Sequence, residues 1–104
     1  MERPVLFHPR AARDLTEIYD YIALEAGLRT AKRFVGRVRN YCLGFSTFPA
    51  RGSLREDIGP GVRVVGFRRQ VSIAFRVNED AIWIVGVYYG GRNIGQPDVE
   101  DDAR

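Results

Sequence analysis

The chain has 104 residues, of which 45% are hydrophobic and 28% charged; this balance fits one globular domain and excludes a disordered chain. Its longest uninterrupted apolar run is only a few residues, which argues against a membrane span, and we expect no secretion signal because the N-terminus lacks an apolar core. The single cysteine, Cys42, excludes an internal disulfide, and we expect it to be a small buried hydrophobe in a cytoplasmic protein.

The net charge of +3 conceals regions of different sign. Residues 1–26 hold three arginines and five acids, a net charge of −2, and residues 93–104 hold one arginine and four acids, a net charge of −3. Residues 27–92 hold twelve basic and four acidic side chains, a net charge of +8. This basic region favours an acidic partner, either nucleic acid or an acidic protein segment, although a solvated basic surface would show the same balance.

The first half of the chain predicts a short strand and two helices. The apolar run 4–7 ends at His8 and Pro9, and because proline suits the first turn of a helix, His8 is expected at the N-cap. The first helix is expected over residues 11–26 and the second over residues 30–45, with Gly27 between them. Apolar residues with helical spacing are Leu15, Ile18, Tyr19, Ile22 and Ala26, then Ala31, Phe34, Val35, Val38, Tyr41, Cys42 and Phe45.

The two predicted helices differ in the charge of their outer faces. The polar residues of the first helix are Arg13, Asp14, Glu17 and Asp20, and those of the second are Lys32, Arg33, Arg37 and Arg39. Both inner faces are apolar, so this helical hairpin is expected to cover one face of a sheet.

Residues 62–92 predict three consecutive antiparallel strands, preceded by a loop over residues 49–61. Runs rich in valine, isoleucine and aromatic residues are broken at Arg68-Arg69 and at residues 78–80. In the middle strand Val71, Ile73, Phe75 and Val77 are expected on one apolar face. In the last strand we expect Ile82, Ile84 and Tyr88 on one face and Trp83, Val85 and Val87 on the other.

The element order β-α-α-β-β-β predicts an α+β fold in which the helical hairpin packs on a twisted, mostly antiparallel sheet. Residues 1–95 are expected to form the single domain, and residues 96–104 a polar, acidic tail.

Common catalytic motifs are absent from the sequence. It contains no phosphate-binding loop of the Gly-x-x-x-x-Gly-Lys type and no Gly-x-Ser-x-Gly elbow, and His8 has no carboxylate or cysteine at metal-ligand spacing. One group of strand residues could hold phosphates and stack on bases, with an arginine stabilising transition-state charge and a tyrosine as proton donor. A basic sheet edge with core tyrosines would produce the same pattern. The group consists of Arg63, Arg68, Arg69, Arg76, Tyr88, Tyr89 and Arg92.

Several motifs, in order, resemble the ParE branch of the RelE/ParE superfamily of bacterial toxins. The first helix carries His8-Pro9-x-Ala11-Ala12-x-Asp14-Leu15-x-x-Ile18-x-x-Tyr21-Ile22, and the second carries Ala31-x-x-Phe34. Pro49-x-x-Gly52, Arg63 and the strand motifs Ile73-x-Phe75-Arg76-Val77 and Ile82-x-Ile84-x-x-Val87 follow. The family ending is matched by Tyr89-Gly90-x-Arg92-Asn93-Ile94, where His-Gly-x-Arg-Asp-Ile is commoner. The resemblance extends over residues 4–94 and agrees with the fold derived from the strand and helix patterns.

The resemblance implies a toxin of a type II toxin–antitoxin system that is neutralised by a ParD-like antitoxin, without any metal or cofactor. ParE-type toxins poison DNA gyrase, whereas RelE-type toxins cut mRNA on the ribosome. Ribosome-dependent nucleases usually carry a tyrosine or histidine near the C-terminus, and no such residue follows Arg92 here, which favours gyrase over mRNA. A third interpretation is a non-toxic basic module that retains the antitoxin contact. By the same resemblance, the antitoxin would form a dimer carrying two toxins and would supply any contact with operator DNA.

These interpretations assign roles to particular residues. For a gyrase-directed toxin, which would have no active site of its own, the target-binding residues are Arg63, Tyr89 and Arg92. For an RNase, the candidate residues are Arg63, Arg76, Tyr88, Tyr89 and Arg92. The arginines assigned to the antitoxin are Arg33, Arg37, Arg68, Arg69 and Arg76.

Overall fold

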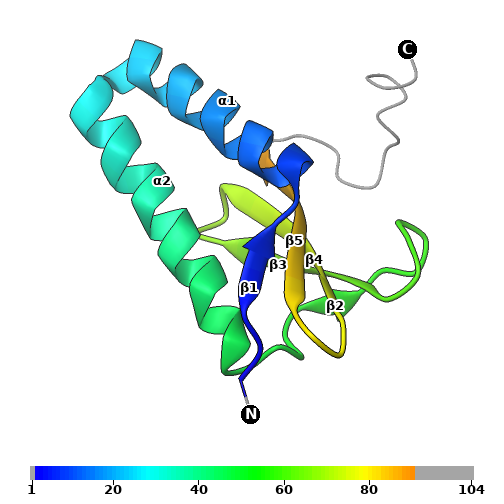
Figure 1. Cartoon of the computed structure of the whole chain (residues 1–104). Helices are drawn as coiled ribbons and strands as arrows, with labels where there is room; N and C mark the ends of the chain where they lie inside the picture. Colours follow the sequence, from blue (N-terminus) through cyan, green and yellow to red (C-terminus); the bar gives the residue numbers. More distant parts are fainter. Residues whose placement is uncertain (1, 91–104) are drawn as a thin grey trace.

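The structure, a computed structural model, describes residues 2–90 as a helical hairpin packed on one face of a five-stranded mixed sheet (Figure 1). The strand order is β1-β5-β4-β3-β2, and only the pairing of β1 with β5 is parallel. The strands are β1 (Val5–Phe7), β2 (Ser53–Leu54), β3 (Val62–Phe67), β4 (Val71–Val77) and β5 (Ile82–Tyr89). The helices are α1 (Pro9–Ala26), α2 (Leu28–Leu43) and the short 3-10 turn η1 (Gly44–Ser46). The predicted α+β architecture is confirmed.

The ends of the two helices follow from local chemistry. His8 is the N-cap of α1, and its Nδ1 accepts a hydrogen bond of 3.1 Å from the backbone N–H of Arg10. Gly27 separates the helices with φ of 98°, in a region that side-chain-bearing residues rarely adopt. The second helix therefore begins at Leu28, two residues earlier than predicted, and ends at Leu43 because the chain tightens into η1. Phe45 nevertheless remains fully buried, as expected from the sequence.

The core lies between the helical hairpin and the sheet. Inward residues of both helices meet Val71, Ile73 and Phe75 of β4, and the ring centroids of Phe45 and Phe75 lie 4.6 Å apart. Cys42 is fully buried in this layer, as predicted, and burial raises the pKa of its thiol to about 12. The apolar periodicities of the sequence therefore identified most of this core correctly.

The predicted loop 49–61 contains the short strand β2, which the sequence did not predict. Two residues are too few for an alternating pattern to be recognised. Gly52, with φ of 71°, turns the chain so closely against β3 that a Cβ at this position would meet the carbonyl oxygen of Val64. Ser53 can then pair with Val64, and Leu54 with Arg63.

A bulge in β5 overturns the predicted faces of its second half. Ala74 pairs with Gly86 but the next residue, Phe75, pairs with Ile84, so Val85 is an extra residue in β5. An extra residue reverses the alternation beyond it. Val87 consequently joins Ile82 and Ile84 in the core, whereas the sequence predicted that Tyr88 would share their face. Tyr88 instead lies over Gly86 on the helix-free face, where a Cβ on Gly86 would come within 2.9 Å of the tyrosine ring.

Candidate functional site

The candidate nuclease residues lie on both faces of the sheet. Arg76 pairs across the sheet with Trp83, and Tyr88 pairs with Ser72, so Arg76 and Tyr88 share the helix-free face. Ser72 and Arg76 lie on the same strand, so at about 3.3 Å per residue Arg76 and Tyr88 are roughly 13 Å apart along the sheet. Arg63 pairs with Phe75 and therefore lies on the helix-covered face. Tyr89 also lies on that face, and Arg92 is outside the described residues. Within residues 2–90, the structure does not bring Arg63, Arg76, Tyr88 and Tyr89 together into one cluster.

Two of these arginines hold the loop that precedes β3. Arg63 Nε donates a 2.9 Å hydrogen bond to the carbonyl of Arg51, and its Nη2 lies 3.5 Å from the carbonyl of Gly52. Arg76 Nε donates a 2.9 Å hydrogen bond to the carbonyl of Pro60. Both guanidinium groups therefore satisfy backbone acceptors of residues 49–61, a structural role that charge patterns in the sequence could not indicate.

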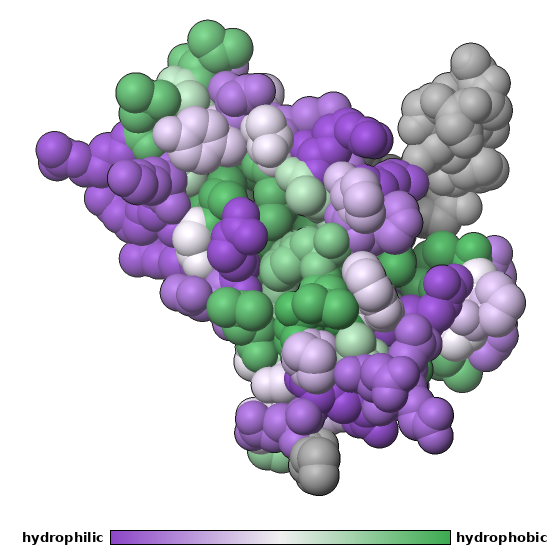
Figure 2. All heavy atoms as spheres, in the orientation of Figure 1, coloured by the Kyte–Doolittle hydropathy of each residue, from purple (hydrophilic) through white to green (hydrophobic). Residues whose placement is uncertain are grey.

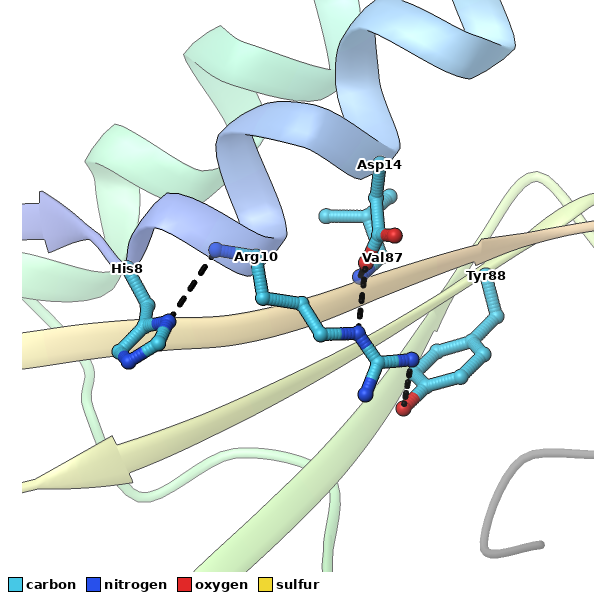
Figure 3. A network of polar contacts seen from close by, with 5 residues as sticks. All are labelled: His8, Arg10, Asp14, Val87 and Tyr88. Carbon is cyan, nitrogen blue, oxygen red and sulfur yellow. Dashed lines mark hydrogen bonds and ion pairs between the residues drawn. The ribbon is translucent and has the colours of Figure 1, made fainter. Parts of the chain in front are cut away.

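A polar network absent from the sequence prediction joins the start of α1 to β5 (Figure 3). Asp14 is only 7% exposed, and its Oδ2 accepts a 2.9 Å hydrogen bond from the backbone N–H of Val87. Arg10 Nε lies 3.7 Å from the same carboxylate oxygen. Arg10 Nη2 also donates to the hydroxyl of Tyr88 at 3.3 Å, and the guanidinium lies 5.4 Å from the centre of that ring.

This network corrects the predicted position of Asp14, which was expected on the polar outer face of the first helix. Strand β1 pairs with β5 only as far as Ile84, so the backbone of Val87 lies beyond the end of β1, and Asp14 supplies its acceptor. The sequence did carry a signal, because Asp14 falls in the same helical stripe as the buried Ala11, Leu15 and Ile18. An acid within an apolar stripe indicates a buried partner.

The arginines assigned to the antitoxin are mostly exposed. Arg68 and Arg69 form the tight turn between β3 and β4 with φ of 55° and 61°, and Gln70 N–H closes the turn on the carbonyl of Phe67 at 3.2 Å. Such conformations cost non-glycine residues about 1–3 kcal/mol each, so the turn presents two arginines in a strained geometry. Arg33 and Arg37 are exposed on α2 and make no side-chain hydrogen bond or ion pair with residues 2–90.

Tyr89 belongs to a groove between the helical hairpin and the end of β5. Its ring centroid lies 5.8 Å from that of Tyr21 and 5.6 Å from that of Phe34. Hollows of about 260 and 290 Å³ lie on either side of the tyrosine pair, and both are lined by Tyr21 and Tyr89. We call this feature the aromatic groove, defined by Tyr21, Phe34 and Tyr89.

The model of the family described as "ParE toxin of type II toxin-antitoxin system, parDE" matches residues 5–94. The chain belongs to the ParE toxin family. It is thus a ParE-type toxin of a type II toxin–antitoxin system, and the resemblance inferred from its sequence motifs is confirmed.

Solved structures support the same assignment. The chain is similar to a structure of the chromosomal ParDE toxin–antitoxin system from P. aeruginosa, with 26% identity, a TM-score of 0.75, and coverage of 86% of this chain and 97% of that one. It shares its fold with a chain of the RelBE2 toxin–antitoxin complex from Mycobacterium tuberculosis, with 20% identity, a TM-score of 0.65, and coverage of 88% and 95%. No curated protein sequence matches the chain closely enough to add to these comparisons.

Over residues 2–90, no group of three potential metal-ligating side chains lies close enough to hold an ion. Neither α1 nor α2 combines the length and apolar composition needed to cross a membrane.

Proposed function

We propose that this ParE-type toxin arrests growth by binding DNA gyrase, without an active site of its own. The observation that carries the proposal is the family match over residues 5–94. The proposal that the chain has no active site is further supported by the sheet, because Arg63 and Tyr89 lie on one face whereas Arg76 and Tyr88 lie on the other. An inhibitor that acts by binding requires a complementary surface rather than an acid and a base within hydrogen-bond reach of one substrate. The target contacts would be made by Arg63, Tyr89 and Arg92.

The proposed neutralising partner is a ParD-like antitoxin with an acidic segment that becomes ordered on binding. Exposed guanidinium groups suit bidentate contacts with carboxylates, and those of Arg33, Arg37 and Arg69 make no side-chain hydrogen bond or ion pair within residues 2–90. In this proposal an antitoxin dimer carries two toxins in the cytoplasm, and contact with operator DNA comes through the antitoxin. The arginines that would contact the antitoxin are Arg33, Arg37, Arg68, Arg69 and Arg76.

Pulse-labelling of DNA and protein synthesis, immediately after expression of the chain alone, tests the target. We expect DNA synthesis to fall first, accompanied by a DNA-damage response, and purified gyrase to lose supercoiling activity when the chain is added. An earlier fall in protein synthesis, with gyrase unaffected, would contradict the proposal. If neither synthesis changes, the chain is a non-toxic binding module.

Separate variants test the two contact surfaces. The single variant Arg92→Ala should weaken gyrase inhibition while antitoxin binding persists. The double variant Arg63→Ala with Arg92→Ala should do the same. The matched control is Arg68→Ala with Arg69→Ala, which should weaken antitoxin binding by roughly tenfold through loss of charge-assisted contacts and leave gyrase inhibition unchanged. Because Arg63 also holds the carbonyl of Arg51, circular dichroism must show that its variant is folded. Undiminished toxicity of the Arg63/Arg92 double variant would refute this target surface.

A second candidate function is ribosome-dependent mRNA cleavage, and the contact between Arg10 and Tyr88 favours it. A guanidinium 3.3 Å from a phenol could stabilise phosphate charge while the phenol transfers a proton. This candidate predicts codon-positioned breaks in mRNA soon after expression, and their loss in Tyr88→Phe. Intact transcripts during growth arrest would exclude it.

A further inference from the structure

A further hollow lies at the opposite end of the sheet from the aromatic groove. Val77 at the end of β4 borders it, whereas Tyr89 of the aromatic groove pairs with Val71 at the start of β4. At about 3.3 Å per residue, Val71 and Val77 lie roughly 20 Å apart along the strand. We call this feature the end hollow; its volume is about 350 Å³, and its lining residues are Arg3, Pro49, Ala50, Leu54, Gly61, Arg63 and Val77.

Segments that are far apart in the sequence build the end hollow. Arg3 Nε donates a 3.3 Å hydrogen bond to the carbonyl of Glu79, which fixes the N-terminal segment against the turn between β4 and β5. The hydroxyl of Thr47 donates a 3.3 Å hydrogen bond to the carboxylate of Glu2, and Figure 1 shows the N-terminus beside the end of α2. Arg63 holds the loop that precedes β3 through two of its carbonyls. Hydrogen bonds of the folded chain therefore keep the hollow in shape.

Both arginines that line the end hollow keep N–H groups for which residues 2–90 supply no acceptor. Arg3 donates only through Nε, and Arg63 donates through Nε and Nη2, so both Nη groups of Arg3 and Nη1 of Arg63 remain available. Neither guanidinium forms an ion pair within residues 2–90, and no carboxylate is among the lining residues. Two such positive groups around one hollow favour an oxyanion, which they can bind through charge-assisted hydrogen bonds.

The rest of the lining is apolar side chain and backbone. Leu54 is 52% exposed, and Pro49 and Val77 are half-buried. No aromatic ring is among the lining residues, so the hollow offers a nucleobase nothing to stack on. Figure 2 shows mainly hydrophilic atoms around this end of the molecule, at the bottom of the view. Apolar walls with a few polar groups, and a volume of this size, are typical of sites for small molecules.

We propose that the end hollow binds a small aliphatic oxyanion, which is a carboxylate or a phosphate monoester on a short alkyl chain. The oxyanion accepts hydrogen bonds from the Nη groups of Arg3 and Arg63. The alkyl chain packs on Leu54 and Val77. An inorganic anion lacks this apolar contact, and an alkylamine is repelled by the two arginines. The inference does not depend on the gyrase target, although Arg63 is also a proposed target contact.

Probes with one alkyl chain and different head groups test the ligand class. Hexanoate, hexyl phosphate, hexanol and hexylammonium are titrated into the full chain at low ionic strength, and binding is measured by NMR. We expect each anion to bind roughly tenfold more tightly than hexanol, and hexylammonium to bind more weakly than hexanol. The methyl signals of Leu54 and Val77 should shift on binding of the anions.

Shorter anions test the apolar walls. Each fully buried methylene strengthens binding by about fourfold, so hexanoate should bind at least roughly tenfold more tightly than acetate even when its chain is only partly covered. Leu54→Ala should reduce this advantage severalfold while acetate binding stays unchanged. Leu54 is exposed on the two-residue strand β2, so the variant should fold, and circular dichroism checks this.

A matched pair of arginine variants provides the decisive comparison. Arg3→Met removes one guanidinium but keeps an apolar stem, so it should weaken hexanoate binding roughly tenfold and leave hexanol binding unchanged. Arg29→Met makes the same change in net charge at an exposed position near the start of α2, outside the hollow, and should alter neither.

Three results overturn the inference: no binding by any probe, equal binding of hexanoate and hexanol, or equal effects of Arg3→Met and Arg29→Met. Gyrase inhibition is measured on the native chain without any probe. Failure of the oxyanion site and failure of the proposed function are therefore separate results.

Discussion

Asp14 provides the sharpest test of how this fold is held together. Replacing it with alanine leaves the N–H of Val87 without its acceptor, in a residue that is only 1% exposed. An unsatisfied buried donor costs about 1–3 kcal/mol. The ion pair with Arg10, whose side chain is 35% exposed, adds at most a few tenths of a kcal/mol because solvent screens it. We therefore expect Asp14→Ala to lower the free energy of unfolding by about 2 kcal/mol.

Urea denaturation and thermal melting measure this loss, which corresponds to a fall in Tm of about 8–16 °C for a domain of this size. Asp14→Asn retains a side-chain oxygen that can accept the Val87 N–H, so it should cost about half as much. Asp20→Ala, an exposed acid on the same helix, is the control and should stay within about 0.5 kcal/mol of the native protein. If Asp14→Ala behaves like Asp20→Ala, or Asp14→Asn is as harmful as alanine, the hydrogen bond does not stabilise the fold as argued.

Two further predictions concern glycine and cysteine. Gly27→Ala should cost about 1–3 kcal/mol for its backbone conformation alone, with φ of 98° and ψ of 160°, because nothing lies within 4 Å of a Cβ there. Gly52→Ala should cost clearly more because its Cβ also meets the Val64 carbonyl, and equal losses in urea denaturation would contradict this. Cys42 should resist iodoacetamide in the native protein at pH 8 and should react once the protein is unfolded. Burial of the neutral thiol should stabilise the fold fully below the ordinary thiol pKa of 9.0, and this stabilisation should decline as the pH rises towards 12.

The sequence predicted the helical hairpin, the three long strands and the family because these depend on short-range regularities. Helical spacing of Leu15, Ile18 and Ile22 identified the buried face of α1, and alternation in β4 placed Ile73 and Phe75 in the core. The family motifs are read from the order of residues along the chain and need no knowledge of which side chains meet.

Only the tertiary structure decided which side chains share a surface. The extra residue Val85 in β5 reversed the faces of Val87 and Tyr88, and a bulge of one residue leaves no distinctive mark on an apolar strand. The bulge also places Tyr88 on the helix-free face, where Arg10 of α1 reaches its hydroxyl, and Tyr89 in the aromatic groove.

The same limit explains the arginines and Asp14. Charge counts along the sequence located a basic region. They could not show which guanidinium groups bond to backbone carbonyls, because those of Arg63 and Arg76 bond to a loop more than ten residues away in the sequence. Asp14 was assigned to a polar face by its charge, yet it is buried because the backbone of β5 lacks an acceptor where β1 ends. Periodicity along the chain thus determined the elements and their buried faces, whereas hydrogen-bond partners distant in sequence determined which polar groups remain available for binding.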